Sequence, residues 1–429
     1  MQKTKFLPLR SVPASSRFKS GDTLVVFGEV FARGYVNGLI DVAKAHGLNV
    51  VYATAGRRDE NQNLRALTAE EIQEKNQSPL INVPLEAGFD LEPPRPVDQL
   101  KGYGLTGWED AQLDWDSIEL SRKRGEERFR KNVTLFINEL RKHIDVKKNL
   151  IFAHTMAGGF PRAKVVMPIA NKIFKGSGAR YSSSAVFWQS EIGRLCAESF
   201  QDVTAETYRH LIELSGDLRH EIETNGASVH YLGYGYHGNE VLIGDQYTWY
   251  SYSPYLQGFA KLRLEDISKE AFAAGVKSTI FNVPEILTNS SSIFLGVEVV
   301  LYPLMRALKK EAGSMRVREI LEKAQSKLKD SVTLEDIDRI TQDYLTNPTV
   351  RAWPKFEGWP QHNGPEQMEL MRAASTQLID LHKNPKDLMT AELSEVVFRA
   401  CGENMFREIS EPRAPVAWIG HDLVAKSTV

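Results

Sequence analysis

The sequence predicts an α/β fold in which a doubly wound, Rossmann-like parallel sheet carries insertions and a C-terminal helical extension. Residues 23–58 have the pattern of a strand, a tight turn, a helix and a second strand, which is the first half of a dinucleotide-binding unit. Short apolar runs and amphipathic stretches then alternate until about residue 315, after which the pattern is helical. We therefore expect a Rossmann-like domain over residues 1–315, an insertion at about residues 92–116, and a helical extension over residues 316–429 packed on that domain.

The first unit begins with the apolar run 23–27, which Gly28 interrupts. Apolar residues then recur at helical spacing from Val36 to Ala43, and a second apolar run follows at 48–53. This order predicts a strand that leads through a turn into a helix and then into a second strand.

The turn after the first strand has small residues where a nucleotide pyrophosphate would need bare backbone close by. Its spacing resembles the Gly-x3-Gly-x-Gly loop of short-chain dehydrogenases, with alanine in place of the middle glycine. Such a turn places helix N–H groups toward the pyrophosphate, although an ordinary strand-to-helix turn is the alternative interpretation. The candidate cofactor-binding residues of this turn are Gly28, Phe31, Ala32, Arg33, Gly34 and Tyr35.

The end of the second strand predicts which nicotinamide cofactor is bound. An acidic residue there usually binds the ribose 2′-OH of NAD, whereas arginine accommodates the 2′-phosphate of NADP. Here Thr54 ends the strand, and Arg57 and Arg58 follow it before Asp59. The sequence thus predicts NADPH, with NADH the less favoured cofactor; a solvated pair of arginines is the alternative interpretation.

A later strand is predicted at residues 149–153, and small residues follow it. In the dehydrogenase fold the fourth strand ends beside the nicotinamide ribose, where small residues let the backbone approach. Ala157 and Gly158 match part of the Asn-Asn-Ala-Gly element of that superfamily, whereas its asparagines are missing. The candidate cofactor-binding residues here are Thr155, Met156, Ala157 and Gly158.

The composition excludes several classes of function. The 429 residues carry a net charge of −2, so no basic excess is available to neutralise the phosphates of a nucleic acid. No apolar run reaches the length of a membrane-spanning helix, and the N-terminus shows no export signal. Cys196 and Cys401 show neither metal-type spacing nor a disulfide framework. We expect a cytoplasmic protein without nucleic-acid, membrane or metal partners, and the sequence is compatible with a homo-oligomer.

A second chemical cluster lies in the aromatic run 247–261, where a helix is expected to begin at Ser253-Pro254. A phenol beside a lysine ammonium has a lowered pKa and can donate a proton to a carbonyl oxygen as charge develops there. Tyr252 forms a Tyr-x8-Lys pair with Lys261, whereas Tyr255 forms a Tyr-x5-Lys pair. We favour Tyr252 as the catalytic phenol and keep Tyr255 open; aromatic packing on a sheet edge is the structural alternative.

These motifs resemble the long single-chain enoyl thioester reductases of fatty-acid synthesis, a divergent branch of the short-chain dehydrogenase superfamily. That family carries Tyr-Ser-Tyr, Tyr-x8-Lys and Gly-x-Ala-Lys elements, and this chain has similar ones at 250–252 and 258–261. Its Pro-Gly-x-x-Thr element is similar to Pro284–Thr288, with Glu285 replacing glycine. The resemblance implies that Pro284 and Thr288 contact the nicotinamide and that Lys261 binds its ribose.

The resemblance also implies the reaction. We expect an NADPH-dependent reductase that delivers hydride to an enoyl thioester or a related activated double bond, so that its partner is a small molecule or an acyl thioester. The alternatives are a keto reductase of the same fold and a non-catalytic NADP-binding sensor or scaffold. Alignment through Gly258-x-Ala-Lys261 places the family's catalytic tyrosine on Tyr255, whereas alignment by spacing places it on Tyr252.

Overall fold

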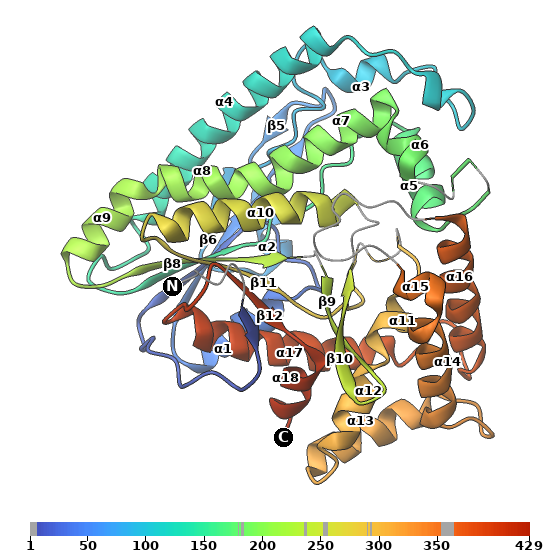
Figure 1. Ribbon diagram of the computed structural model, residues 1–429. Coiled ribbons are helices and arrows are strands. Elements are labelled where there is room, and N and C mark those ends of the chain that lie inside the picture. Colours follow the sequence, from blue (N-terminus) through green and yellow to red (C-terminus); the bar gives the residue numbers. More distant parts are fainter. Residues whose placement is uncertain are drawn as a thin grey trace.

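An eight-stranded parallel sheet forms the centre of the structure (Figure 1). The computed structural model describes residues 7–178, 180–181, 184–235, 238–251, 256–289, 291, 294–352 and 364–429. The strand order is β1-β12-β11-β8-β7-β2-β3-β6. The bounds are β1 Leu7–Leu9, β2 Thr23–Phe27, β3 Asn49–Thr54, β6 Leu80–Pro84, β7 Leu150–His154, β8 Val229–Gly235, β11 Lys277–Asn282 and β12 Val416–Ile419. The predicted fold class is confirmed.

The order of the strands reverses at β2, which pairs with β3 on one side and with β7 on the other. Val25 lies opposite Val51 of β3 and Phe152 of β7 in these two ladders. In open parallel sheets a ligand binds outside the carboxyl ends of the strands at such a switch point. The fold therefore predicts a ligand site at the carboxyl ends of β2 and β7.

The strands are buried on both faces, and alternate residues enter two separate hydrophobic cores. In β2, Leu24 and Val26 pack in one core, and Val25 and Phe27 pack in the other. This follows from the two-residue period of a strand covered by helices on both sides. The first core includes α1 (Val36–Ala45) and α17 (Thr390–Ile409); the second includes α4 (Trp115–Leu140), α8 (Thr207–Leu214), α9 (Gly216–Thr224) and α10 (Leu256–Ala273).

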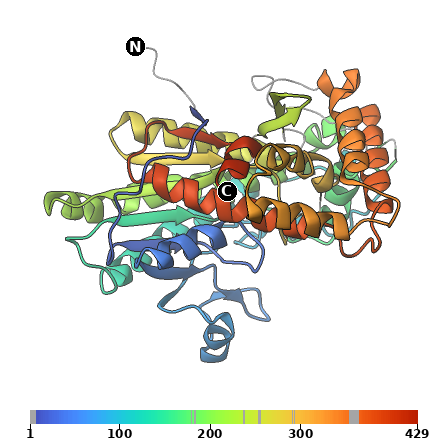
Figure 2. The same cartoon turned by 90° about the horizontal axis from the view of Figure 1, so that it is seen from below.

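The C-terminal part of the chain is largely helical, as expected, but it also contributes β12 to the sheet and α17 to one face. Seen from below the sheet, α1 and α17 lie side by side (Figure 2). A Cβ on Gly402 would lie 2.2 Å from the carbonyl carbon of Gly38, so the two backbones touch where both residues are glycine. Helices on both sides of residue 315 share one core.

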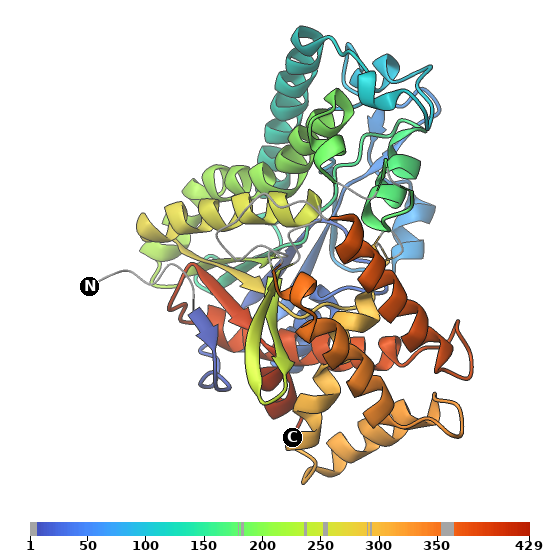
Figure 3. The same ribbon diagram turned by 45° about the vertical axis from the view of Figure 1, so that its right-hand side comes forward.

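The remaining elements connect the sheet to its surroundings. The hairpin of β9 and β10 packs beside α12 and α14 (Figure 3). The expected insertion contains two short helices, α3 and η1, and the first residues of α4. Among the described residues, no helix has the length and apolar character needed to cross a membrane. The other bounds are β4 Arg57–Arg58, β5 Leu64–Arg65, α2 Ala69–Lys75, α3 Pro96–Gln99, η1 Trp108–Asp110, α5 Val166–Phe174, α6 Ser184–Trp188, α7 Glu191–Phe200, η2 Gln201–Glu206, β9 Gly238–Ile243, β10 Gln246–Ser251, α11 Val297–Leu301, α12 Leu304–Lys310, α13 Met315–Ser326, α14 Leu334–Thr346, α15 Pro348–Arg351, α16 Pro365–Asp380 and α18 His421–Lys426.

Candidate active site

A cavity of about 210 Å³ lies at the carboxyl ends of β2, β7, β8 and β11. It brings together two clusters that the sequence analysis singled out separately, the glycine turn and the region around Lys261. Nine of the predicted site residues line it: Phe31, Arg33, Gly34, Tyr35, Thr155, Ala157, Gly158, Lys261 and Thr288. Eight more lining residues are Glu29, Val36, Tyr234, Gly235, Glu285, Asn289, Ser291 and Phe294.

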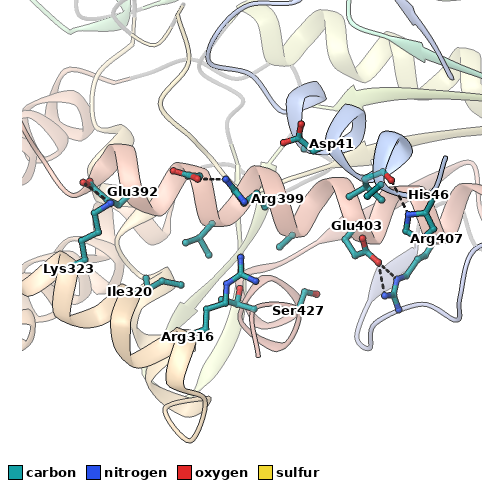
Figure 4. Close-up of a pocket in the computed structure, with 17 residues that line it drawn as sticks. Asp41, His46, Arg316, Ile320, Lys323, Glu392, Arg399, Glu403, Arg407 and Ser427 are labelled. Atoms are coloured by element: carbon teal, nitrogen blue, oxygen red, sulfur yellow. Dashed lines mark hydrogen bonds and ion pairs between the residues drawn. The ribbon is translucent and has the colours of Figure 1, made fainter. Parts of the chain in front are cut away.

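A larger hollow of about 650 Å³ lies among α1, α13 and α17 (Figure 4), and no predicted site residue lines it. Its charged side chains are largely paired with one another, as in Lys323–Glu392 and Arg407–Glu403. We interpret it as a solvated groove between helices, and the smaller cavity as the candidate active site.

The turn after β2 presents the first turn of α1 to the cavity. Asn37 donates side-chain hydrogen bonds to the carbonyl oxygens of Phe31 (2.9 Å) and Ala32 (3.3 Å), which holds the turn in place. Within the described residues, α1 begins without a side-chain cap, and N–H groups of its first turn donate to carbonyl oxygens of the preceding turn at 3.2 Å. The positive end of the α1 dipole lies at the cavity, where it favours an anion. Gly34 lines the cavity, and a Cβ there would meet no atom within 4 Å.

Gly28 does not line the cavity, and its role is packing. Its φ is +133°, and a Cβ there would lie 2.5 Å from Thr155 Oγ1. The ends of β2 and β7 can therefore approach each other only because residue 28 is glycine. Met156 is likewise buried behind the cavity, whereas Thr155, Ala157 and Gly158 line it.

An acidic residue that the sequence analysis missed lies at the end of β3. Glu29 Oε1 accepts hydrogen bonds from Thr54 Oγ1 (2.7 Å) and from the backbone N–H of Ala55 (2.9 Å), and Lys75 Nζ binds Oε2. Arg57 Nη1 lies 3.6 Å from Oε1. Burial acts to raise the pKa of Glu29, but the hydrogen bonds from Lys75, Thr54 and Ala55 outweigh it and lower the pKa. The carboxylate is therefore charged at neutral pH.

Arg58, predicted to bind a 2′-phosphate, belongs to a network of three arginines and three acids. Its guanidinium donates to Glu86 (2.7 and 3.1 Å), and only 9% of its side chain is exposed. Arg162 bridges Glu86 (2.8 Å) and Asp90 (2.9 Å), and the network also includes Arg128 and Glu92. Asp90 is thus bound to an arginine. The sequence did not predict these ion pairs because the paired residues lie far apart along the chain.

The opposite end of the cavity contains Lys261, which is 6% exposed and lies in the second turn of α10. Burial lowers the pKa of its ammonium to about 7, because an apolar environment disfavours the charged form. Within the described residues it has neither an ion pair nor a hydrogen bond that offsets this penalty. A charge on Lys261 is therefore costly until an anion or a developing negative charge approaches it.

Residues after β11 complete this end. Thr288 lines the cavity, and its backbone N–H donates to Ser291 Oγ (2.6 Å). Pro284 does not line the cavity, but its carbonyl oxygen accepts a hydrogen bond from Tyr35 Oη (2.7 Å). Tyr35 also stacks on Tyr234 with ring centroids 5.8 Å apart. The glycine turn, β8 and the end of β11 are thus joined through one tyrosine.

The two candidate catalytic tyrosines, Tyr252 and Tyr255, lie outside the described residues. The neighbouring Tyr250 is in β10, and its phenol oxygen lies 3.1 Å from that of Tyr344. Among the described residues, no group of three or more His, Cys, Asp or Glu side chains could hold a metal ion.

Comparisons with known proteins bear on this arrangement. The family model "Enoyl-acyl carrier protein reductase FabMG" matches residues 5–428. A solved apo structure of FabMG, described as a novel type of enoyl-acyl carrier protein reductase, has 44% identity, a TM-score of 0.94 and 98% coverage of both chains. An NADH-bound structure of FabMG has 39% identity, a TM-score of 0.80 and 98% coverage of both chains. No curated protein sequence matches significantly.

Proposed function

Because this chain belongs to the FabMG family of enoyl-acyl carrier protein reductases and is an NAD(P)H-dependent reductase, we propose that it reduces an enoyl thioester in the cavity at the ends of β2, β7, β8 and β11. One observation carries this assignment. The glycine turn and Lys261 are far apart in sequence, and both line this cavity. The family match disfavours the two alternatives from the sequence, a keto reductase and a non-catalytic sensor.

The residues of the cavity suit a nicotinamide dinucleotide. The N-terminus of α1 and the backbone around Arg33 and Gly34 would hold the pyrophosphate, since the positive end of the helix dipole lies there and both residues line the cavity. Glu29 would lie at the adenosine ribose, and Thr288 and Lys261 would lie at the nicotinamide ribose. When bound, the reduced nicotinamide supplies a hydride to the β-carbon of the enoyl thioester.

Lys261 has two roles in this proposal. Its ammonium binds the ribose hydroxyls, and its positive charge lowers the pKa of the catalytic phenol. The phenol of Tyr252 or Tyr255 donates a hydrogen bond to the thioester carbonyl oxygen, which becomes negative as the hydride arrives at the β-carbon. A proton then reaches the α-carbon, so that the double bond is reduced by one hydride and one proton. We keep Tyr252 as the favoured phenol.

We infer that the chain is a divergent member of the short-chain dehydrogenase superfamily. Support comes from the strand order, since β6-β3-β2-β7-β8-β11 corresponds to the order 3-2-1-4-5-6 of doubly wound dinucleotide-binding sheets. The placement of a lysine in the helix after the fifth of these strands is in keeping with the motif resemblance. Fold and motifs support this affiliation independently.

We also infer that NADH is preferred over NADPH, contrary to the preference taken from the two arginines. Arg58 is held by Glu86, and a carboxylate, that of Glu29, lies at the end of β3. Carboxylates at this position bind a ribose 2′-OH and repel a 2′-phosphate. The FabMG structure with 39% identity contains NADH.

Two further proposals concern the surroundings of the enzyme. We propose an acyl thioester on a carrier protein as substrate, in line with the family description. We propose a reducing, cytoplasmic location because Cys196 and Cys401 are both free and buried. The compatibility with a homo-oligomer stays a prediction.

The test of the proposed function is an assay with purified protein, a short trans-2-enoyl thioester and either cofactor. We expect saturable oxidation of the cofactor with formation of the saturated thioester, and no oxidation with a 3-ketoacyl thioester. Reduction that persisted after replacement of Lys261 and of both candidate tyrosines would contradict the proposed site. Reduction of the ketoacyl substrate alone would contradict the proposed reaction.

A further inference from the structure

The carboxylate of Glu29 lies between the cavity and two cations. We propose that Lys75 and Arg57 form a latent binding site for the ribose 2′-phosphate and that Glu29 occupies it, so that this one carboxylate sets the choice between NADH and NADPH. The inference rests on the proposed function only in taking the cavity as the dinucleotide site. It assigns to Glu29 the role of determining cofactor specificity. It also assigns to the same pocket a capacity to bind NADPH that Glu29 blocks.

The contacts of Glu29 show how the site is filled. One oxygen accepts from Thr54 Oγ1 at 2.7 Å and from the Ala55 N–H at 2.9 Å, and the other binds Lys75 Nζ. The side chains of Glu29 and Lys75 are only 13% and 12% exposed. Arg57 Nη1 lies 3.6 Å from Glu29 Oε1 and donates to the Gly56 carbonyl oxygen at 2.8 Å, and 45% of the Arg57 side chain is exposed. A single anion thus compensates one largely buried cation and one exposed cation.

The helix α2 positions Lys75. It is the last residue of α2, which begins with a capping box between Thr68 and Glu71 and ends at Asn76 in a left-handed conformation. The excursion of β4, β5 and α2 after β3 therefore returns the Lys75 ammonium to the end of the sheet. The helix places the backbone of Lys75, and the contact with Glu29 holds its ammonium.

Both cations depend on Glu29 for compensation. Within the described residues, Glu29 is the only carboxylate within 4.0 Å of Lys75 or of Arg57. Arg58 differs, because Glu86 and Glu92 both lie within that distance and neither faces the cavity. If Glu29 loses its charge, Lys75 becomes a poorly hydrated ammonium without a counter-ion, and a phosphate dianion is then the favourable replacement.

The first test compares NADH and NADPH binding by calorimetry for the full chain and for Glu29→Gln. Glutamine keeps an oxygen that can accept from Thr54 and Ala55 while it removes the charge. We expect NADPH to bind about tenfold more tightly and NADH about tenfold more weakly, so the affinity ratio shifts by about 100-fold. The matched control is Glu71→Gln, which removes one charge from the same excursion at a residue paired with Arg65; its ratio is expected to stay unchanged.

An unchanged ratio in folded Glu29→Gln, or an equal loss of affinity for both cofactors, would overturn the inference. The double variant Glu29→Gln/Lys75→Met tests the latent site itself, and we expect it to lose the gained NADPH affinity. Retention of that affinity would remove Lys75 from the site.

If Glu29→Gln does not fold, Lys75→Met alone tests the inference. We expect it to weaken NADPH binding about tenfold and NADH binding less than threefold, because Glu29 then repels the phosphate without a neighbouring ammonium. Unchanged NADPH binding would overturn the inference. These measurements do not depend on turnover: the expected ratios in a chain that reduced no enoyl thioester would contradict the proposed function while supporting this inference.

Discussion

The end of the cavity that we propose for the adenosine and the end that we propose for the nicotinamide differ in how their charges are compensated. At the adenosine end, each charged group has a partner: Glu29 binds Lys75, Arg58 binds Glu86, and behind them Arg162 binds Asp90. At the nicotinamide end, Lys261 is equally buried, yet it has no ion pair among the described residues, and burial lowers its pKa to about 7.

This difference separates recognition from chemistry. Paired, hydrogen-bonded charges hold one geometry and suit a group that does not change during the reaction, such as a ribose. A buried ammonium without a counter-ion interacts most strongly with charge that develops beside it, because the surrounding dielectric is low. Substitutions at the two ends should therefore have different signatures, one in cofactor choice and the other in rate.

The largest expected effect comes from Lys261→Met. Loss of the ammonium removes both the ribose contact and the charge that lowers the phenol pKa, so kcat should fall by about 1,000-fold. Cofactor choice should not change, because the NADH-to-NADPH affinity ratio is set at the other end. The control is Lys269→Met in the same helix, whose ammonium pairs with Asp266 at 2.9 Å. A changed affinity ratio with near-normal kcat would reverse the roles given to the two ends.

The next effect distinguishes the two tyrosines at the nicotinamide end. Tyr252→Phe should lower kcat by about 100-fold, since it removes the proposed hydrogen-bond donor to the thioester oxygen. Tyr255→Phe serves as its matched control and should change kcat less than threefold. Steady-state rates with a saturating enoyl thioester make the comparison. The opposite pattern would assign the chemistry to Tyr255.

At the adenosine end, Arg58→Met should affect stability and leave specificity unchanged. It removes a guanidinium that is 9% exposed and leaves Glu86 with only Arg162, so the free energy of unfolding should fall by about 2 kcal/mol. NADPH affinity should change less than twofold. Denaturant unfolding and calorimetry measure the two quantities. A selective loss of NADPH affinity at unchanged stability would make Arg58 a phosphate ligand after all.

The smallest effect is a pH dependence. Because Lys261 loses its proton near pH 7 in the free enzyme, kcat/KM for the cofactor should fall up to about tenfold per pH unit above that value. The unfolded chain keeps this proton up to its ordinary pKa of 10.5, so the unfolded state binds more protons between pH 7 and 10.5. Lys261 should therefore make the free enzyme more stable as the pH rises through this window. Lys261→Met should lose both dependences, and a wild-type profile in this variant would contradict the assignment.

Local patterns predicted much of the fold and nine of the residues that line the candidate cavity. Gly34 and Lys261 were singled out because strand-to-turn and turn-to-helix transitions leave signals within a few residues. β12 was missed because four apolar residues within a helical region carry no distinguishing period.

The adenosine end was predicted least well, for a related reason. The sequence shows two arginines after a strand, but it does not show that Glu86 binds one of them or that Lys75 approaches Glu29. Both pairings depend on how the excursion after β3 folds back. The sequence signal for this acid was Glu29, directly after the turn glycine Gly28. It lies before the second strand, whereas an acid that binds the ribose is usually sought at the end of that strand.

The most direct test is a crystal structure of the chain with NADH. We predict that the adenosine ribose hydroxyls bind Glu29, that the pyrophosphate lies at the first turn of α1, and that Lys261 Nζ is within hydrogen-bond distance of the nicotinamide ribose. A dinucleotide bound outside this cavity, or bound in it with the nicotinamide ribose beside Glu29, would contradict the proposed site.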